Sequence, residues 1–422
     1  MPSTASSSNS VMSRSLFMVG GYEPKSPEAF FKRTRRELAR SVSSWQAAAP
    51  HATASVSSEA LSEDGQVATA NIRSRFEQHQ TEVSTQFNFC VWNDIVLNDF
   101  AQPTLVRVGK YLRTFSEFVL NGTFLRMLQQ AWRFSLYFLY PVIALSLISL
   151  LATLAGTVVI SAFPASALAT TCGCLAGAAT WWGLLKASGR RLFVLHLMDL
   201  WSFSRAYARG GRPDARAHID RWAQAIVDRD RANTDDEIIL VGHSTGGAVI
   251  LDVAATALKK HPALGTGRAR ITVLTVGSTA LKIGLHPSAK WFRDQVQALL
   301  DHSTIQWIEC QSMTDVINFY KTDPAKAMGL EPKLEQQKPE VHIVRMKHMV
   351  EPKFYKRMRR NFFRIHYQFI MGNTLDYVYD FYAFCCSARP IQETLGTTLR
   401  YLPSNSDQMV DGSDEQQGWQ LR

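Results

Sequence analysis

A serine lies between glycines where an apolar strand-like segment meets a helix-like segment. Residues 237–241, EIILV, have the composition of a β-strand, and Gly242-His243-Ser244-Thr245-Gly246 follows them directly. The next residues, 247–260, have helical spacing. A serine in so sharp a strand-to-helix turn has a strained backbone, and the glycines remove Cβ atoms that would collide there. The pattern predicts an exposed nucleophile at Ser244; the alternative is a glycine-rich turn that holds a structural serine.

The helix that follows this turn can also stabilise negative charge. The N-terminus of a helix carries partial positive charge and N–H groups without partners inside the helix. The N–H of Thr245 is therefore a candidate donor for an oxyanion that forms when Ser244 attacks a carbonyl.

This segment resembles the nucleophile elbow of the α/β-hydrolase superfamily, in its lipase- and esterase-like branch. The resemblance extends over the chain outside a long uncharged segment and the two tails. It implies an acid after a later strand and a histidine near the end of the chain, in the order serine, acid, histidine.

The acid is expected after the second strand that follows the nucleophile strand. That strand is IQWIEC (305–310), and the next segment, QSMTDVINF, contains Asp315. Asp315 is therefore the predicted acid. Glu309, inside the strand, and Asp323, before a proline, are alternatives, and an ordinary surface or capping role for Asp315 also remains open.

Three histidines follow the predicted acid: His342, His348 and His366. His366 lies among aromatic residues, which suits a base that must be partly shielded from water. It is the predicted base, and His348, two residues after the strand-like VHIVRM, is the alternative base. A histidine that is hydrogen-bonded to backbone at the edge of the core is the non-catalytic interpretation.

A second oxyanion donor is expected in the loop after an early strand. The segment FMVGGYEP has two glycines that allow close approach of backbone to a substrate, and the N–H of Gly21 or Tyr22 is the predicted donor. No histidine precedes these glycines, so the segment departs from the HGGG form of this loop. A simple glycine turn is the alternative.

Residues 134–185 contain no Asp, Glu, Lys, Arg or His. One membrane-spanning helix needs about 20 apolar residues, so this segment predicts two helices, about 134–160 and 167–185, joined by a turn. Lysines and arginines flank the segment on both sides, which predicts that both termini and the hydrolase domain are cytoplasmic and that only the turn crosses the membrane. The alternative is a helical hairpin buried in a soluble core.

Outside the predicted hairpin, strand-like and helix-like segments alternate. This order predicts an α/β fold with a mostly parallel sheet covered by helices on both faces. Residues 14–133 and 186–402 are the predicted N- and C-terminal parts of the hydrolase domain. The tails 1–13 and 403–422 are rich in Ser and in Gln/Asp, respectively, and predict disorder. The six cysteines have neither zinc-like spacing nor the pattern of a disulfide framework, which favours a reducing compartment.

The chain carries a formal net charge of +10, which indicates an anionic partner. Residues 353–364, KFYKRMRRNFFR, combine six cations with Phe and Tyr. An RNA-binding patch is conceivable, but beside a membrane hairpin the prediction is contact with anionic lipid headgroups and no nucleic acid. A solvated basic helix face is the alternative.

Together these features predict a membrane-anchored serine hydrolase that cleaves a carboxylic ester, with lipids among the expected substrates. The bilayer and an acyl substrate are the predicted partners, and the mechanism needs no metal or organic cofactor. Two alternatives remain open: an inactive membrane scaffold on the same fold, and an acyltransferase in which another alcohol replaces water.

Overall fold

The computed structural model describes residues 10–47, 49–76, 81–333 and 339–396. Most of the predicted N-terminal tail and all of the predicted tail 403–422 lie outside the described residues. Val11, within the predicted tail 1–13, is buried, and its N–H donates a hydrogen bond to the Ala388 carbonyl at 2.7 Å. Packed structure therefore begins before residue 13.

The chain divides into two compact units. One is formed by the residues up to Val96 together with those from Arg212 onward, and the other is Leu97–Gly211. The first unit contains the sheet and all residues predicted to form the site, and the second contains the predicted hairpin.

A nine-stranded sheet, counted over the described residues, forms the centre of the first unit. Its order is β2-β4-β5-β1-β6-β7-β8-β9, with β3 paired to β4. The strands are β1 (Ser13–Val19), β2 (Thr53–Val56), β3 (Ala60–Leu61), β4 (Val67–Phe76), β5 (Thr81–Cys90), β6 (Glu237–His243), β7 (Arg270–Val276), β8 (Ile305–Gln311) and β9 (Glu340–Ile343). Neighbouring strands pair in parallel along the stretch β5-β1-β6-β7-β8-β9. The pairs β2–β4, β3–β4 and β4–β5 are antiparallel. The predicted mostly parallel sheet is confirmed.

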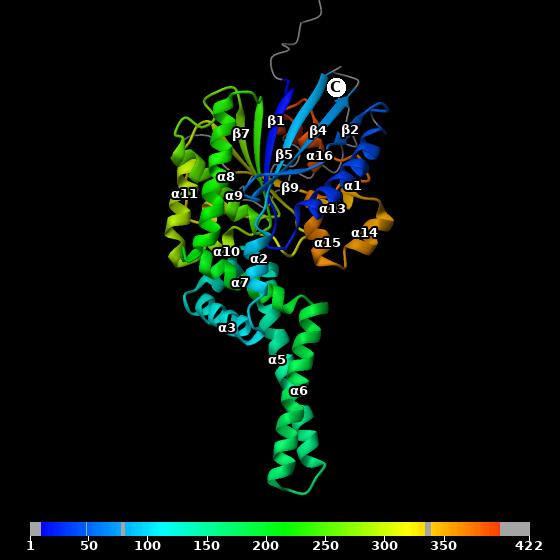
Figure 1. Cartoon of the computed structure of the whole chain (residues 1–422), viewed down its shortest axis with the longest axis vertical. Helices are drawn as coiled ribbons and strands as arrows, with labels where there is room; N and C mark the ends of the chain where they lie inside the picture. Colours follow the sequence, from blue (N-terminus) through cyan, green and yellow to red (C-terminus); the bar gives the residue numbers. More distant parts are fainter. Residues whose placement is uncertain (1–9, 48, 77–80, 334–338, 397–422) are drawn as a thin grey trace, which may run out of the picture. The chain divides into compact units, whose positions relative to one another are not determined.

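Helices cover both faces of this sheet. The helices of the first unit are α1 (Pro27–Trp45), α8 (Pro213–Ala232), α9 (Gly246–Lys260), α10 (Leu281–Gly284), α11 (Lys290–Leu300), α12 (Pro324–Ala327), α13 (Met346–Met349), α14 (Pro352–Met358), α15 (Phe362–Tyr367), α16 (Phe381–Cys386) and α17 (Ile391–Leu395), with 3-10 helices η2 (Pro287–Ala289) and η3 (Gln368–Ile370). Figure 1 shows α8, α9 and α11 on one side of the sheet and α1 and α16 on the other. Because both faces are covered, every residue of the central strand β6 is buried, as is typical of parallel sheets.

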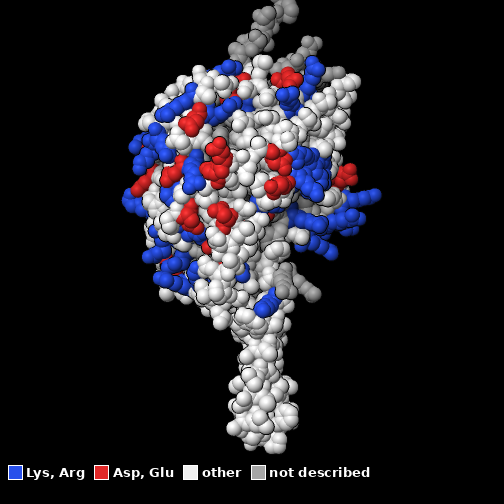
Figure 2. All heavy atoms as spheres, in the orientation of Figure 1, with Lys and Arg blue, Asp and Glu red and all other residues white. Residues whose placement is uncertain are grey.

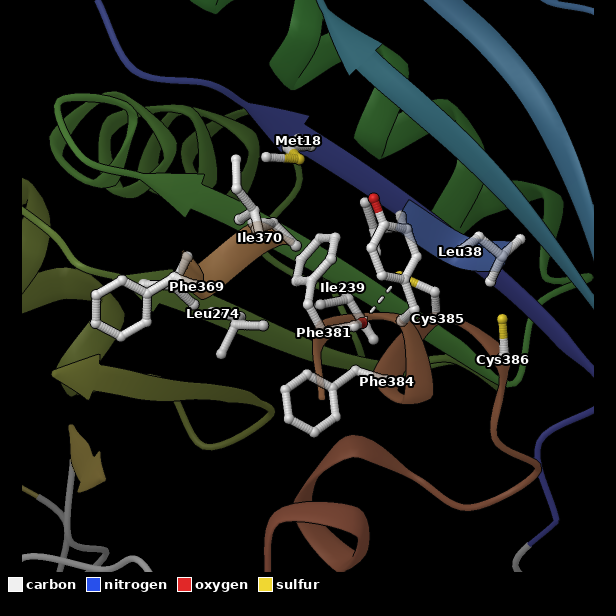
Figure 3. Close-up of a cluster of buried hydrophobic side chains, with 14 of the residues drawn as sticks. Met18, Leu38, Ile239, Leu274, Phe369, Ile370, Phe381, Phe384, Cys385 and Cys386 are labelled. Carbon is white, nitrogen blue, oxygen red and sulfur yellow. Dashed lines mark hydrogen bonds between the residues drawn. The ribbon is translucent and has the colours of Figure 1, made fainter. Parts of the chain in front are cut away.

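The core on the α1 and α16 side joins distant parts of the sequence. Figure 3 shows Met18 of β1, Leu38 of α1 and Ile239 of β6 in one buried cluster with Phe381 and Cys385 of α16. Alternate residues of each strand point to this side, since side chains alternate across a sheet. The cluster therefore fixes the C-terminal helices, including the region of His366, against the strands that position the serine.

Five helices make up most of the second unit: α3 (Thr104–Leu120), α4 (Thr123–Gln130), α5 (Trp132–Ser161), α6 (Ala167–Arg191) and α7 (Val194–Ala208), while α2 (Asn93–Phe100) lies at the boundary between the units. The segment predicted to form two helices forms α5 and α6, which pack side by side along their length (Figure 1). Both are long and apolar enough to cross a membrane, judged by length and composition.

Small residues lie at the closest approach between α5 and α6. A Cβ at Gly156 would lie 2.9 Å from the Gly173 carbonyl oxygen, and a Cβ at Gly177 would lie 3.1 Å from the Ala152 carbonyl oxygen. Glycines at these positions let the two backbones approach closely, a packing mode common between membrane helices. The opposite faces are apolar and open: only 22% and 17% of the most apolar stretches of α5 and α6 are buried.

Candidate active site

Ser244 occupies the sharp turn between β6 and α9, where the sequence predicts a nucleophile. Its φ of +58° lies in the left-handed region, which a serine adopts only when its surroundings impose it. The loop after β7 supplies that constraint. The Ser244 N–H donates to the Val276 carbonyl at 3.3 Å, and the Thr279 N–H donates to the Ser244 carbonyl at 3.0 Å.

The glycines beside Ser244 are required by close backbone contacts. A Cβ at Gly246 would lie 2.2 Å from the Val19 carbonyl oxygen at the end of β1. A Cβ at Gly242 would lie 2.6 Å from the Gly246 carbonyl oxygen. Both distances are shorter than any normal contact, so α9 can begin at this point only because neither residue has a side chain.

His366 and Asp315 meet although 51 residues separate them. His366 Nδ1 lies 2.7 Å from Asp315 Oδ2, and both side chains are buried. The other carboxylate oxygen, Oδ1, accepts the Ile317 N–H at 2.8 Å, which fixes the orientation of the acid. A carboxylate can only accept, so the histidine donates through Nδ1 and leaves Nε2 as the atom able to take a proton.

His366, the predicted base, lies close to the loop that holds Ser244. Gly277 follows the residue that accepts the Ser244 N–H, and a Cβ at Gly277 would lie 3.3 Å from His366 Cε1. His366 Nε2 is buried and forms no hydrogen bond to any described residue, Ser244 included. Such hydrogen bonds are often long in enzymes without substrate and shorten when the substrate binds.

His243, the residue before the serine, packs against His366, the predicted base. Its ring centroid lies 4.7 Å from that of His366, and its Nε2 lies 3.1 Å from the His366 carbonyl oxygen, so that Nε2–H donates. Burial, together with the neighbouring His366, lowers the pKa of His243 well below its ordinary value. His243 is therefore neutral near pH 7. Its role was not predicted, because the position before the serine in G-x-S-x-G carries no requirement of its own.

Two of the predicted oxyanion donors lie at the serine. Thr245 is buried and precedes the first residue of α9, so its N–H is not used within the helix. A Cβ at Gly21 would lie 3.3 Å from Ser244 Cβ and 3.7 Å from its Oγ, which puts the loop after β1 beside the serine. Tyr22, the other candidate, is buried, with its ring edge-on to Trp92 at 6.0 Å.

A buried lysine holds the side chain of Thr245. Lys282 of α10 donates from Nζ to Thr245 Oγ1 at 2.8 Å. Burial lowers the pKa of this amine well below its ordinary value. Sequence reasoning missed Lys282, because a single lysine in a short helix is ordinarily exposed to solvent.

The alternative base lies elsewhere. His348 of α13 is exposed, and its ring stacks on Tyr377 with centroids 5.8 Å apart. The third histidine, His342, is buried on β9 and lies 3.5 Å from a Glu340 carboxylate oxygen. No hydrogen bond or ion pair links either of these described residues to Asp315.

The alternative acids also have other partners. Asp323 caps α12, where its side chain accepts the N–H groups of Ala325 and Lys326 at 2.9 and 3.1 Å. Glu309 is buried on β8 and accepts a hydrogen bond from the Thr275 hydroxyl. Burial raises the pKa of Glu309 to about 8.

The raised pKa of Glu309 predicts a pH-dependent stability that Glu309→Gln removes. Between its ordinary pKa of 4.5 and about 8, the folded chain keeps a proton that the unfolded chain loses, so stability falls as pH rises. The slope is up to about 1.4 kcal/mol per pH unit for one group. Thermal unfolding of the full chain in detergent from pH 5 to 8 should therefore decline less steeply in Glu309→Gln than in the parent. Exposed Glu63→Gln is the control, and equal slopes in all three proteins would refute the prediction.

A family model described as "Alpha/beta hydrolase family" matches residues 169–383, about half of the chain. The matched region contains Ser244, Asp315 and His366. The chain belongs to the α/β hydrolase family. Strands β1 to β5 lie before the matched region, and the structure shows that they complete the same sheet. Neither a curated protein nor a solved structure matches the chain.

Proposed function

We propose that the protein is a membrane-anchored serine hydrolase that cleaves carboxylic esters, with lipid esters as the favoured class. The observation that carries the proposal is the buried His366–Asp315 pair, 2.7 Å apart, beside a serine held at φ +58° in a strand–turn–helix elbow. Membership of the α/β hydrolase family, whose members are generally hydrolases, supports the same activity.

The proposed reaction uses side chains and backbone alone. Ser244 Oγ attacks the acyl carbonyl carbon while His366 Nε2 takes the hydroxyl proton. Asp315 holds the Nδ1–H and stabilises the imidazolium, and the N–H of Thr245 with one at Gly21 or Tyr22 stabilises the oxyanion. His366 then protonates the leaving alcohol. Water, deprotonated by the same nitrogen, hydrolyses the acyl-enzyme and regenerates the serine.

A fluorophosphonate probe tests the proposal directly, because it reacts only with an activated serine. The full chain in detergent should be labelled, and denaturation before labelling should abolish the signal. Absence of labelling in the folded protein would instead favour the inactive scaffold.

The membrane anchor is proposed to be the α5–α6 hairpin. Its outer surface is apolar, few of its residues are buried, and small residues lie at the closest approach between its two helices. A hairpin in a soluble core would bury most of these side chains, whereas lipid would cover them without a protein partner. The hairpin would hold the hydrolase unit at a lipid surface, which favours lipid esters over soluble ones.

Reporter fusions test the proposed topology. Fusions after Leu128 and after Arg191 should both report a cytoplasmic location, because basic residues flank both helices. A reporter inserted between residues 161 and 166 should be translocated. Opposite locations for the two flanking fusions would mean a single span, and three cytoplasmic reporters would mean that the hairpin does not cross.

A further inference from the structure

Six exposed cations gather at one place on the first unit. They lie on α14, in the turn after it and on α15, and we call them the basic face: Lys353, Lys356, Arg357, Arg359, Arg360 and Arg364. No Asp or Glu occurs from Pro352 to Arg364. Figure 2 shows lysine and arginine side chains gathered on the side of this unit where Figure 1 places α14.

The charges of the basic face are not compensated within the protein. None of the six forms an ion pair with a described residue, whereas arginines elsewhere on the unit do. Arg216 pairs with Asp252, and Arg229 pairs with Asp235, each at 2.6 Å. A solvated face that served only solubility would ordinarily mix charges of both signs. An uncompensated cluster of one sign instead attracts an anionic partner.

Exposed aromatic side chains lie among these cations. Phe354 is 36% exposed and Phe362 is 58% exposed. Arg40 of α1 lies over the Phe354 ring, 5.8 Å from its centroid, so α1 borders the basic face. Cations around exposed phenylalanines suit a lipid interface, where the charges meet headgroups and the rings enter the boundary with the acyl chains.

The basic face shares a helix with the proposed base. α15 carries Phe362 and Arg364, both exposed, and His366, which is buried and bonded to Asp315. Contact at the outer residues of this six-residue helix therefore takes place within a few residues of the proposed proton acceptor. An ester held in the same lipid surface would lie close to the site.

We propose that the basic face docks on anionic phospholipid headgroups of the bilayer in which the protein is anchored. The docking places α15 at the lipid surface, and its link to substrate rests on the ester-hydrolase function proposed above. The face acts independently of the hairpin: the hairpin anchors the chain, and the basic face selects for anionic lipid.

Hydrogen exchange of the full chain in lipid nanodiscs tests the docking. Exchange over residues 352–367 should be at least several-fold slower in discs with 30% phosphatidylglycerol than in pure phosphatidylcholine discs. Sodium chloride at 0.5 M should remove the difference, because exposed charges are screened within a few ångströms at that ionic strength. Equal exchange in the two kinds of disc would overturn the proposal.

Matched variants identify the residues responsible. Lys353→Gln, Lys356→Gln and Arg357→Gln combined should abolish the lipid-dependent slowing. The combination Lys259→Gln, Lys260→Gln and Lys290→Gln removes the same charge from exposed positions on α9 and α11 and should leave it intact. If both triple variants lose the slowing equally, net charge alone is responsible and the basic face is not a docking site.

Two further measurements separate this proposal from others. The first measurement adds an oligouridylate to the protein in phosphatidylcholine discs. If hydrogen exchange over residues 352–367 then slows, the basic face binds nucleic acid and not lipid. Fluorophosphonate labelling in detergent should be equal in the parent and both triple variants. If neither the parent nor either triple variant is labelled, the proposed hydrolase function is contradicted. The hydrogen-exchange evidence for docking would be unaffected.

Discussion

Replacing Ser244 by alanine is expected to lower kcat/KM toward a short p-nitrophenyl ester by about 10⁴- to 10⁶-fold, as removal of a nucleophile does in related chemistry. The alanine keeps the backbone bonds to Val276 and Thr279, so the elbow should remain folded. It removes only the hydroxyl oxygen that we propose as the nucleophile. Steady-state hydrolysis by the purified full chain in detergent gives the measurement.

Two controls distinguish loss of chemistry from loss of structure. Ser43→Ala changes an exposed serine on α1 and should retain full activity. The Ser244→Ala protein should unfold within a few degrees of the parent and should fail to react with the fluorophosphonate probe. Near-normal turnover in Ser244→Ala would show that another residue is the nucleophile.

His366→Gln should reduce hydrolysis about as much as Ser244→Ala, because the members of such a triad act as a unit. Glutamine can still reach Asp315 but cannot take a proton from the serine. His348→Gln should cost little, since that side chain is exposed and stacked on Tyr377. Both variants are assayed on the same ester from about pH 6 to 9, the range in which a histidine base titrates.

The paired design makes each outcome informative. An inactive His348→Gln beside an active His366→Gln would transfer the role of base to α13 and leave the serine assignment in place. Two active variants would exclude both His348 and His366 as the base. Asp315→Asn should also lose most of the activity, because it weakens the hydrogen bond from His366 Nδ1 that fixes the imidazole ring.

The parts of the site that sequence predicted are those set by local patterns or by strand order. A serine between glycines, with a strand before it and a helix after it, is the pattern of a nucleophile elbow. Asp315 was placed through the family resemblance, which implies an acid after the second strand beyond the nucleophile strand. The structure puts its carboxylate in contact with His366.

The parts that sequence did not predict depend on contacts between distant residues. His243 supports His366 across 123 residues, and Lys282 reaches Thr245 across 37. Neither contact leaves a pattern around the residue itself. The strands β2 and β3 were also not predicted, since residues 46–66 are rich in Ala and Ser and look like a loop. Their pairing with β4 decides their conformation.

The predicted end of the second long helix also differs from the structure. The prediction ended the second helix at residue 185, where charges begin, but α6 continues to Arg191. Lysine and arginine are good helix formers, so a change in charge marks a change of environment and not the end of a helix. The apolar length, not the helix length, bears on the proposed membrane crossing.

The sheet order has a consequence for how this protein folds during its synthesis on the ribosome. β1 lies between β5 and β6, and the Met12 N–H bonds to Asp236, 224 residues later. At roughly 5–20 residues per second, translation takes roughly 11 to 45 seconds to deliver that partner. Meanwhile the helices of the second unit must emerge and, if they insert, enter the bilayer. Until then β1 offers an open apolar edge, which is a site for mispairing or for a chaperone. We therefore expect the yield of folded protein to depend on how quickly translation delivers β6.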